Sequence, residues 1–183
     1  MSKVKRLIES YAQFIQLPWR DDAAAAQRVA FCVYPETEEL RIRANLGEFE
    51  LTTRQSGHDW IAFDLSDTFA RWMAEQKYAE GYFRSPSKLP TVLHRYLEWL
   101  VDGFVANLDA NEVDDNHVVM IYGVGSLFGL LKVKEVVDRL APHVPGRLVV
   151  LFPGSFEQNN YRLLDGYDGW NYLATPILPD GAR

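Results

Sequence analysis

The stretch His117-Val-Val-Met-Ile-Tyr-Gly-Val-Gly-Ser-Leu-Phe-Gly129 decides the fold of this chain. Its apolar run, residues 118–122, is too short for a helix and rich in β-branched residues, so it predicts a buried strand. Two glycines end the strand, and Ser126 then stands where a helix N-cap belongs. The helical spacing that follows predicts a helix from Ser126 to Leu140.

A second apolar run, Leu148 to Phe152, follows this helix and is cut at Pro153-Gly154. It predicts another buried strand. Strand, glycine turn, helix and strand together form a βαβ unit, in which the two strands are parallel. Strands that are apolar throughout, rather than alternating, are typical of a parallel sheet covered on both faces.

The same patterns extend along the rest of the chain. Further strands are expected at Arg28 to Tyr34, Trp60 to Leu65 and Trp170 to Ile177. Helices are expected at Lys3 to Gln16, Glu36 to about Leu51, Thr68 to Lys77 and Leu89 to Leu108, with loops at Tyr78 to Ser87 and Asp109 to Asn116. This alternation predicts a single α/β domain over residues 1–183, with an open, mostly parallel sheet and helices on both faces. Ligands of such folds usually bind beyond the carboxyl ends of the strands.

Composition narrows the class of protein. The 183 residues are 48% hydrophobic, enough for a sizeable core, and carry a net charge of -6. This charge argues against a protein whose main task is to grip nucleic acid, although a local basic patch is left open. The single cysteine, Cys32, lies in an apolar run and is expected to be buried rather than nucleophilic. Neither a signal peptide nor a membrane-spanning run is found, so a cytoplasmic protein is expected.

The glycine turn after residue 122 is the main candidate for ligand binding. Backbone N–H groups of such a turn can approach a phosphate at a helix N-terminus. The match to a Walker A loop is poor, because the second glycine is replaced by Phe128 and Lys132 is displaced. A tight strand-to-helix turn is therefore the favoured interpretation. The alternative is a nucleotide or nucleic-acid phosphate bound by Gly123, Gly125, Ser126, Pro153 and Gly154.

Other kinds of catalytic or metal site find little support. Ser126 is not in a Gly-x-Ser-x-Gly elbow, and Ser155 has no evident base. The four histidines lack the paired spacing of a metal site. Asp64, Asp165 and Asp168 could meet as a divalent-cation site or in a hydrolase, but the last two are more typical of Asp-Gly turns. No catalytic residue, cofactor or metal is therefore assigned.

The segment from Phe156 to Tyr172 has the composition of an interface. It combines tyrosine, tryptophan and asparagine with a single arginine, as the centres of protein interfaces do. The candidate partner-binding residues are Tyr161, Arg162, Tyr167, Trp170 and Tyr172. An equally good interpretation is that the apolar members of this segment pack against the edge of the sheet.

Three motifs in this order resemble the BrxB family of bacteriophage-exclusion (BREX) defence systems. They are Tyr122-Gly-Val-Gly-Ser-Leu-Phe128, Leu151-Phe-Pro-Gly-Ser-Phe156 and Asn171-Tyr-Leu-Ala174. The resemblance covers about a third of the chain and departs from the family pattern at Gly129–Lys134 and at Ser155. It implies a component without catalytic activity that helps to assemble an anti-phage complex. The phosphatase-like protein PglZ is the first partner that it implies, with other BREX components after it.

Overall fold

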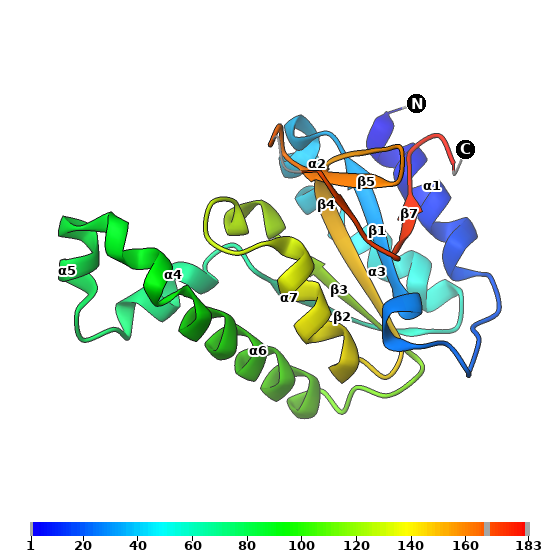
Figure 1. The fold of residues 1–183 in the computed structure, drawn as a ribbon. Helices are drawn as coiled ribbons and strands as arrows, with labels where there is room; N and C mark the ends of the chain where they lie inside the picture. Colours follow the sequence, from blue (N-terminus) through cyan, green and yellow to red (C-terminus); the bar gives the residue numbers. More distant parts are fainter. Residues whose placement is uncertain (1, 167–168, 182–183) are drawn as a thin grey trace.

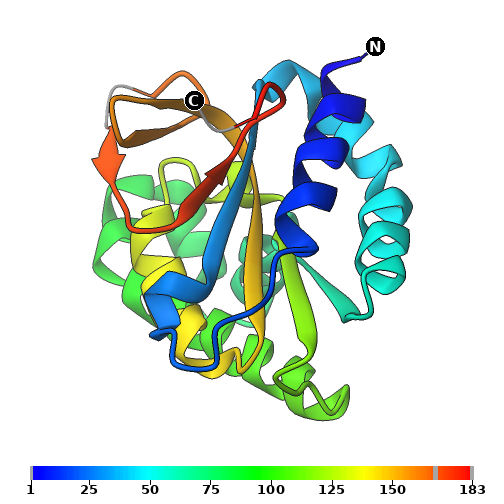
Figure 2. The same ribbon diagram turned by 90° about the vertical axis from the view of Figure 1, so that its right-hand side faces the viewer.

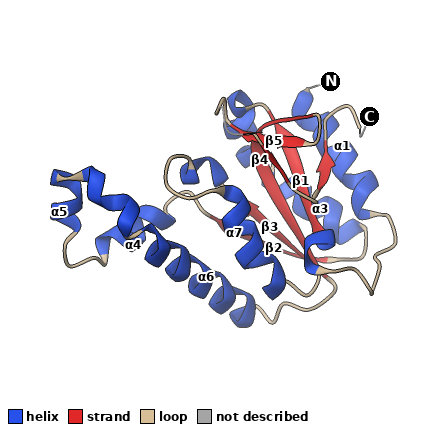
Figure 3. Cartoon of the chain, in the orientation of Figure 1, coloured by secondary structure: helices blue, strands red, loops and turns tan. Residues whose placement is uncertain are grey.

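The centre of the molecule is an open, parallel sheet, seen in a computed structural model that describes residues 2–166 and 169–181 (Figure 1). Its strands lie in the order β2-β3-β4-β1-β7, and each neighbouring pair in this row is parallel. The strands are β1 (Val29–Tyr34), β2 (Asp59–Asp64), β3 (His117–Tyr122), β4 (Arg147–Glu157) and β7 (Thr175–Ile177). The predicted α/β class is confirmed (Figure 3).

Helices cover both faces of the sheet, as expected, with β1, β3 and β4 between them (Figure 2). On one face lie α1 (Lys3–Ile15), α2 (Glu39–Ala44) and α3 (Leu46–Gln55). On the other lie α4 (Thr68–Ala74), α6 (Leu93–Ala110) and α7 (Val133–Leu140), while α5 (Ala79–Arg84) extends away from the sheet. Successive strand residues point to opposite faces, so both sides of β1 must be apolar. All six residues of β1 are buried, which explains its unbroken hydrophobic run.

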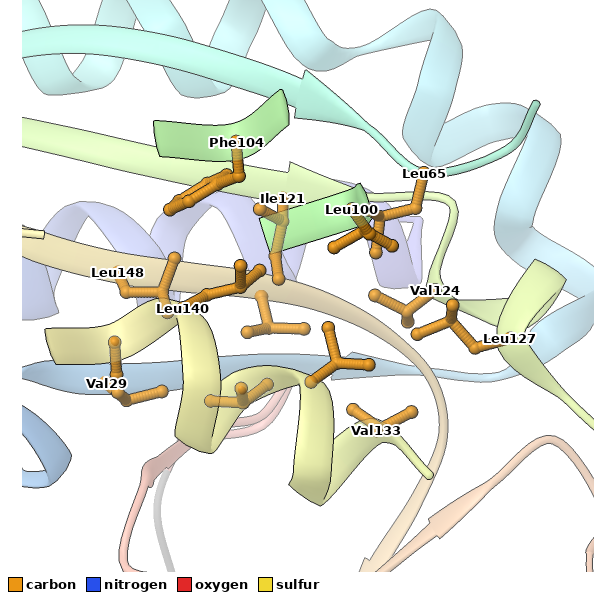
Figure 4. Close-up of a cluster of buried hydrophobic side chains, with 14 of the residues drawn as sticks. Val29, Leu65, Leu100, Phe104, Ile121, Val124, Leu127, Val133, Leu140 and Leu148 are labelled. Carbon is orange, nitrogen blue, oxygen red and sulfur yellow. The ribbon is translucent and has the colours of Figure 1, made fainter. Parts of the chain in front are cut away.

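The larger half of the core lies between the sheet and helices α6 and α7. Figure 4 shows Leu100 and Phe104 of α6 and Leu140 of α7 beside Ile121 of β3 and Leu148 of β4. Each of these five side chains is at most 1% exposed. Because the amphipathic helices bury their apolar faces on this sheet, the packing fixes their positions above the strands.

Two predictions about the glycine turn are wrong. Residues Val124–Leu127 form a short 3-10 turn, and the helix begins only at Val133, with Lys132 in the N-cap position. Ser126 does not cap a helix, because its one hydroxyl proton is directed to the carbonyl oxygens of Gly123 and Leu65, which lie 2.7 and 3.0 Å from Oγ. The turn therefore links the end of β3 to the residue that follows β2.

The sequence predicts that the strand ending in Phe152 stops at Pro153-Gly154, but this prediction is wrong. Strand β4 continues through these residues and changes its pairing partner there. Up to Pro153 it pairs with β1, and from Gly154 to Glu157 it pairs antiparallel with β5 (Asn160–Leu163). A proline cannot donate to a ladder, but its carbonyl still accepts a bond from Leu164 N at 2.8 Å. The hairpin turns at Gln158-Asn159, both with positive φ, as a two-residue hairpin requires.

Other boundaries differ more modestly. The helix expected from Glu36 to Leu51 is divided at Asn45 into α2 and α3. The loop expected at Tyr78 to Ser87 contains α5, and α6 starts at Leu93 because Pro90 lies in a preceding 3-10 helix, Pro86–Thr91. The closing strand is split into β6 (Trp170–Asn171), which pairs with β5, and β7, which pairs with β1.

Candidate functional site

Polar side chains gather at the carboxyl ends of β1, β2 and β3. The parallel order brings Tyr34 at the end of β1, Asp64 at the end of β2 and Tyr122 at the end of β3 to the same edge of the sheet. Helix α2 follows β1 and places Glu39 and Arg43, one turn apart, beside them. The expectation that functional groups collect at this edge therefore has a structural basis.

Arg43 is the centre of this cluster. Its Nε donates to Glu39 Oε1 at 3.0 Å, and its terminal nitrogen contacts Asp64 Oδ1 at 3.5 Å and the hydroxyl of Ser66. The guanidinium also lies over the ring of Tyr122, 5.2 Å from the centroid. Burial lowers the pKa of Arg43, but the hydrogen bond to Glu39 and the charge of Asp64 outweigh it, and the net pKa is raised.

The second oxygen of Glu39 is also engaged. The hydroxyl of Tyr34 donates to Glu39 Oε2 at 2.6 Å. Burial, and then the acceptor Glu39, raise the pKa of Tyr34 well above its usual range. Tyr34 therefore remains a neutral donor at physiological pH. Its bond to the carboxylate of Glu39 links β1 to α2.

The Gly123 turn is shaped by the same cluster. Gly123 has φ +76°, and a Cβ there would lie 2.8 Å from Asp64 Oδ1. Asp64 Oδ1 in turn accepts bonds from the backbone N and the hydroxyl of Ser66, at 2.8 and 2.5 Å. The glycine is needed for close approach between two strand ends. The turn lacks the following helix N-terminus on which the phosphate-binding alternative depends.

A cavity of about 300 Å³ opens beside this turn. It brings together four of the five ligand-binding candidates, Gly123, Gly125, Ser126 and Pro153. Glu36 and Glu39 line it with a single basic residue, Arg43, which Glu39 already neutralises. This charge balance disfavours a phosphate ligand.

The fifth candidate, Gly154, lines a different and larger cavity of about 520 Å³. This cavity lies beside the end of β1 and the part of β4 that follows Pro153. The chain leaves β1 toward β2 and leaves β4 toward β7, in opposite directions along the sheet. Lys3 and Arg6 of α1 line the cavity, and Arg6 Nε forms an ion pair with Asp180 Oδ1 at 3.3 Å. The sequence signal for this cavity is the basic start of the first helix.

The partner-binding candidates divide into two groups. Tyr161 is fully buried, and its hydroxyl donates to the carbonyl of Ala174 at 2.8 Å. Trp170 and Tyr172 are partly buried and lie 5.8 and 5.7 Å, by ring centroids, from Phe31 of β1. These three aromatic side chains thus pack against the sheet, as the competing interpretation of the segment expected, although they cover one face of β1 and β4 rather than the edge.

Arg162 is the exposed candidate. It lies on β5 and lines a shallow groove of about 300 Å³ together with Ser155, Glu157 and Asn160. Tyr167, the remaining candidate, lies outside the described residues. The polar groove on the outer face of the β4–β5 hairpin is therefore the part of this segment that a partner can reach.

The structure describes two of the three aspartates considered as a cation site, so it does not test that site. Asp64 is bound to Arg43 and Ser66, Asp165 is exposed, and Asp168 lies outside the described residues. Among residues 2–166 and 169–181, three side chains of ligating type come together at Asp59, Asp114 and His117, at the amino ends of β2 and β3. His117 there lowers the pKa of the exposed Asp114 by a hydrogen bond of 2.7 Å.

Sequence reasoning missed Glu39, Arg43 and Ser66 as members of the cluster. Their signal was an acid and an arginine four residues apart, in the helix that follows a buried strand. That pattern is common on solvated helices, so only the neighbouring strand ends distinguish this pair from an ordinary surface salt bridge. Within the part of the chain that the structure describes, no helix has the length and apolar character to cross a bilayer.

Comparison with known proteins gives one match. A family model, BREX protein BrxB, matches residues 61–176. No curated protein and no solved structure matches the chain. The matched part runs from β2 into β7 and includes Asp64, Ser66 and the Gly123 turn, whereas Tyr34, Glu39 and Arg43 precede it.

Proposed function

The chain belongs to the BrxB family of BREX proteins, and we propose that it is a non-catalytic component that assembles other proteins of the anti-phage system. The first partner we propose is the phosphatase-like protein PglZ. Family membership, through the match over residues 61–176, is the observation that carries this proposal.

The polar cluster at the carboxyl edge supports the non-catalytic part of the proposal. A general base or nucleophile needs a lone pair or proton that is free to reach a substrate. Here Glu39 accepts from Tyr34 and Arg43, and Asp64 Oδ1 accepts from Ser66. The single hydroxyl proton of Ser126 is shared by two carbonyl oxygens. These bonds tie α2 and the Gly123 turn to the strand ends, so the cluster serves the rigidity of the fold.

Purified protein offers a direct test of this part. Neither phosphate esters nor nucleic acid should be hydrolysed at a rate above that of buffer. Hydrolysis that disappears in Asp64→Asn would contradict the proposal, provided that the variant unfolds at the same urea concentration as the wild type.

The assembly part is tested by pull-down of the tagged protein from its native host, with and without nuclease. We expect recovery of PglZ that nuclease treatment does not reduce. Recovery of nucleic acid alone, or loss of PglZ after nuclease, would contradict a direct protein contact.

Arg162→Ala is the matched test of the hairpin groove. This exposed side chain contributes little to stability, so its removal should weaken partner binding while the free energy of unfolding changes by less than about 0.5 kcal/mol. Arg20→Ala is the control, since Arg20 is 76% exposed and pairs with the neighbouring Asp22. Equal binding by both variants would remove the groove from the interface. Trp170→Ala is unsuitable, because Trp170 packs against Tyr161 and Phe31.

A thermal-shift assay tests the competing ligand-binding function. A ligand at one hundred times its dissociation constant stabilises a protein by about 2.7 kcal/mol. We expect no change in Tm with ATP, GTP, NAD or S-adenosylmethionine, with or without magnesium. A rise in Tm that Ser126→Ala reduces would favour ligand binding at the Gly123 turn instead.

A further inference from the structure

An arm formed by residues 74–95 extends away from the sheet, with α5 at its tip (Figure 1). It joins α4 to α6, and not one of its residues is buried. The sequence predicted a loop over part of it, but the structure shows α5 followed by a 3-10 helix, Pro86–Thr91. Its apolar side chains are of two kinds: Ala79, Tyr82, Leu89, Val92 and Leu93 pack, partly buried, against the core, whereas Tyr78 and Phe83 are exposed. The first set holds the arm in place, and the second set faces solvent.

The base of the arm is firmly anchored. Trp72 of α4 and Tyr96 of α6 are 2% and 0% exposed, with ring centroids 5.4 Å apart. The hydroxyls of Tyr96 and Thr68 lie 2.7 Å apart, and Thr68 donates to the carbonyl of Leu65 at the end of β2. This buried contact fixes the direction in which the arm leaves the sheet.

The tip carries two large aromatic side chains that are mostly exposed. Tyr78 is 66% exposed and Phe83 is 68% exposed, and Tyr82 between them is partly exposed. Aromatic side chains are the residues that most often carry the binding energy of protein interfaces. Tyr78 and Phe83, five residues apart on a projecting element, are therefore the side chains through which the arm can contact a partner.

The arm is also basic, although the chain is acidic. Residues 74–95 contain the four cations Lys77, Arg84, Lys88 and Arg95 against two acids, Glu75 and Glu80, while the whole chain has a net charge of -6. Arg84 lies 3.4 Å from Glu80, and Lys77 lies over the ring of Tyr78 at 5.5 Å. Cations around exposed aromatics complement an acidic surface that contains an apolar pocket.

We propose that this arm is the docking element of the protein, and that Tyr78 and Phe83 enter an apolar pocket on an acidic face of PglZ. This inference rests on the proposed function and adds to it the surface used and the chemistry of the partner's face. A protein partner fits better than nucleic acid, because a projecting arm can reach a limited acidic face, whereas an extended polyanion would also approach the acidic remainder of the chain. The family match over residues 61–176 includes the whole arm.

Binding titrations with purified PglZ test the inference with two arm variants. Tyr78→Ala/Phe83→Ala removes the apolar contact, and Lys77→Glu/Lys88→Glu reverses the charge. The control is Leu40→Ala on α2, where an apolar side chain is 81% exposed away from the arm. All four altered arm residues are exposed, so far-UV circular dichroism and urea midpoints should match the wild type.

We expect each arm variant to bind PglZ at least about tenfold more weakly, with the control unchanged. Wild-type affinity should fall as salt is raised. The affinity of the charge-reversed variant should fall less, or should rise, with added salt. Wild-type binding that both arm variants retain would overturn the arm as docking element and leave the proposed function standing. No binding of PglZ by the wild type would overturn both.

A single-stranded oligonucleotide is the second probe. The wild type should not bind it at physiological salt. Binding that is lost in both arm variants would assign the arm to nucleic acid and overturn the protein-docking inference.

Discussion

The hydroxyl of Tyr34 lies 2.6 Å from Glu39 Oε2 and joins the end of strand β1 to helix α2. Tyr34→Phe removes this bond and keeps the buried ring. Because the acceptor is charged but still partly exposed, the free energy of unfolding should fall by about 1 to 2 kcal/mol. Urea unfolding measures the change. Tyr78→Phe, whose residue is 66% exposed, is the control and should have no effect; an equal loss in both would contradict the role of the bond.

Buried tyrosines should make the protein sensitive to alkali. Burial is the largest cause that raises the pKa of Tyr11, Tyr34, Tyr161 and Tyr172 above the ordinary value of 10.0. Below pH 10 the folded and the unfolded chain both hold these protons, so the tyrosines cause no loss of stability there. Above pH 10 the unfolded chain releases them and the folded chain retains them, so stability falls by up to about 1.4 kcal/mol per pH unit for each tyrosine.

Urea midpoints between pH 8 and pH 11.5 would reveal this dependence. The fall above pH 10 should be less steep in Tyr34→Phe. A midpoint that stays constant to pH 11.5 would show that the four hydroxyls titrate normally in the folded state.

Gly123→Ala should be destabilising for two separable reasons. The residue has φ +76°, and a Cβ would lie 2.8 Å from Asp64 Oδ1 and 2.9 Å from Ser66 N. Gly129 has the same φ but nothing within 4 Å, so Gly129→Ala measures the backbone cost alone, about 1 kcal/mol. We expect Gly123→Ala to cost at least about 2 kcal/mol by urea unfolding. Equal costs would mean that Ser66 and Asp64 move aside freely.

Cys32 should be inert in the folded protein. Its side chain is 0% exposed in the middle of β1, and burial raises the pKa of the thiol. A thiol reagent such as Ellman's should therefore react with no cysteine in native buffer and with one per chain in denaturant. Rapid reaction in native buffer would show that β1 becomes accessible through local opening.

Several features could be predicted from sequence because they depend on local patterns. Apolar runs of strand length identified β1, β2 and β3, and three- and four-residue spacing identified α1 and α6. The glycine turn was recognised as a strand end. The sequence could not show that no helix begins at Ser126. The hydroxyl of Ser126 bonds instead to the carbonyl of Leu65, which is 61 residues away. A capping pattern in sequence cannot reveal such a competitor.

The candidate interface shows the same limit. Tyrosine and tryptophan enrichment marked residues 156–172, but it did not distinguish the buried Tyr161 from the exposed Arg162. The arm tip was overlooked because residues 78–87 contain glycine, proline and serine, which are typical of loops. Its short helices lack the apolar periodicity that burial imposes on longer ones.

The sequence by itself determined the α/β class, the apolar strands and the family resemblance, since each depends on residues that are close along the chain. Tertiary structure alone decided the strand order, the change of partner within β4, and the meeting of Arg43 with Asp64 and Ser66. It also decided which aromatic side chains are covered. These features depend on contacts between distant segments, and many pairings satisfy the same local hydrophobic pattern. Packing of both helical layers against one sheet selects among them.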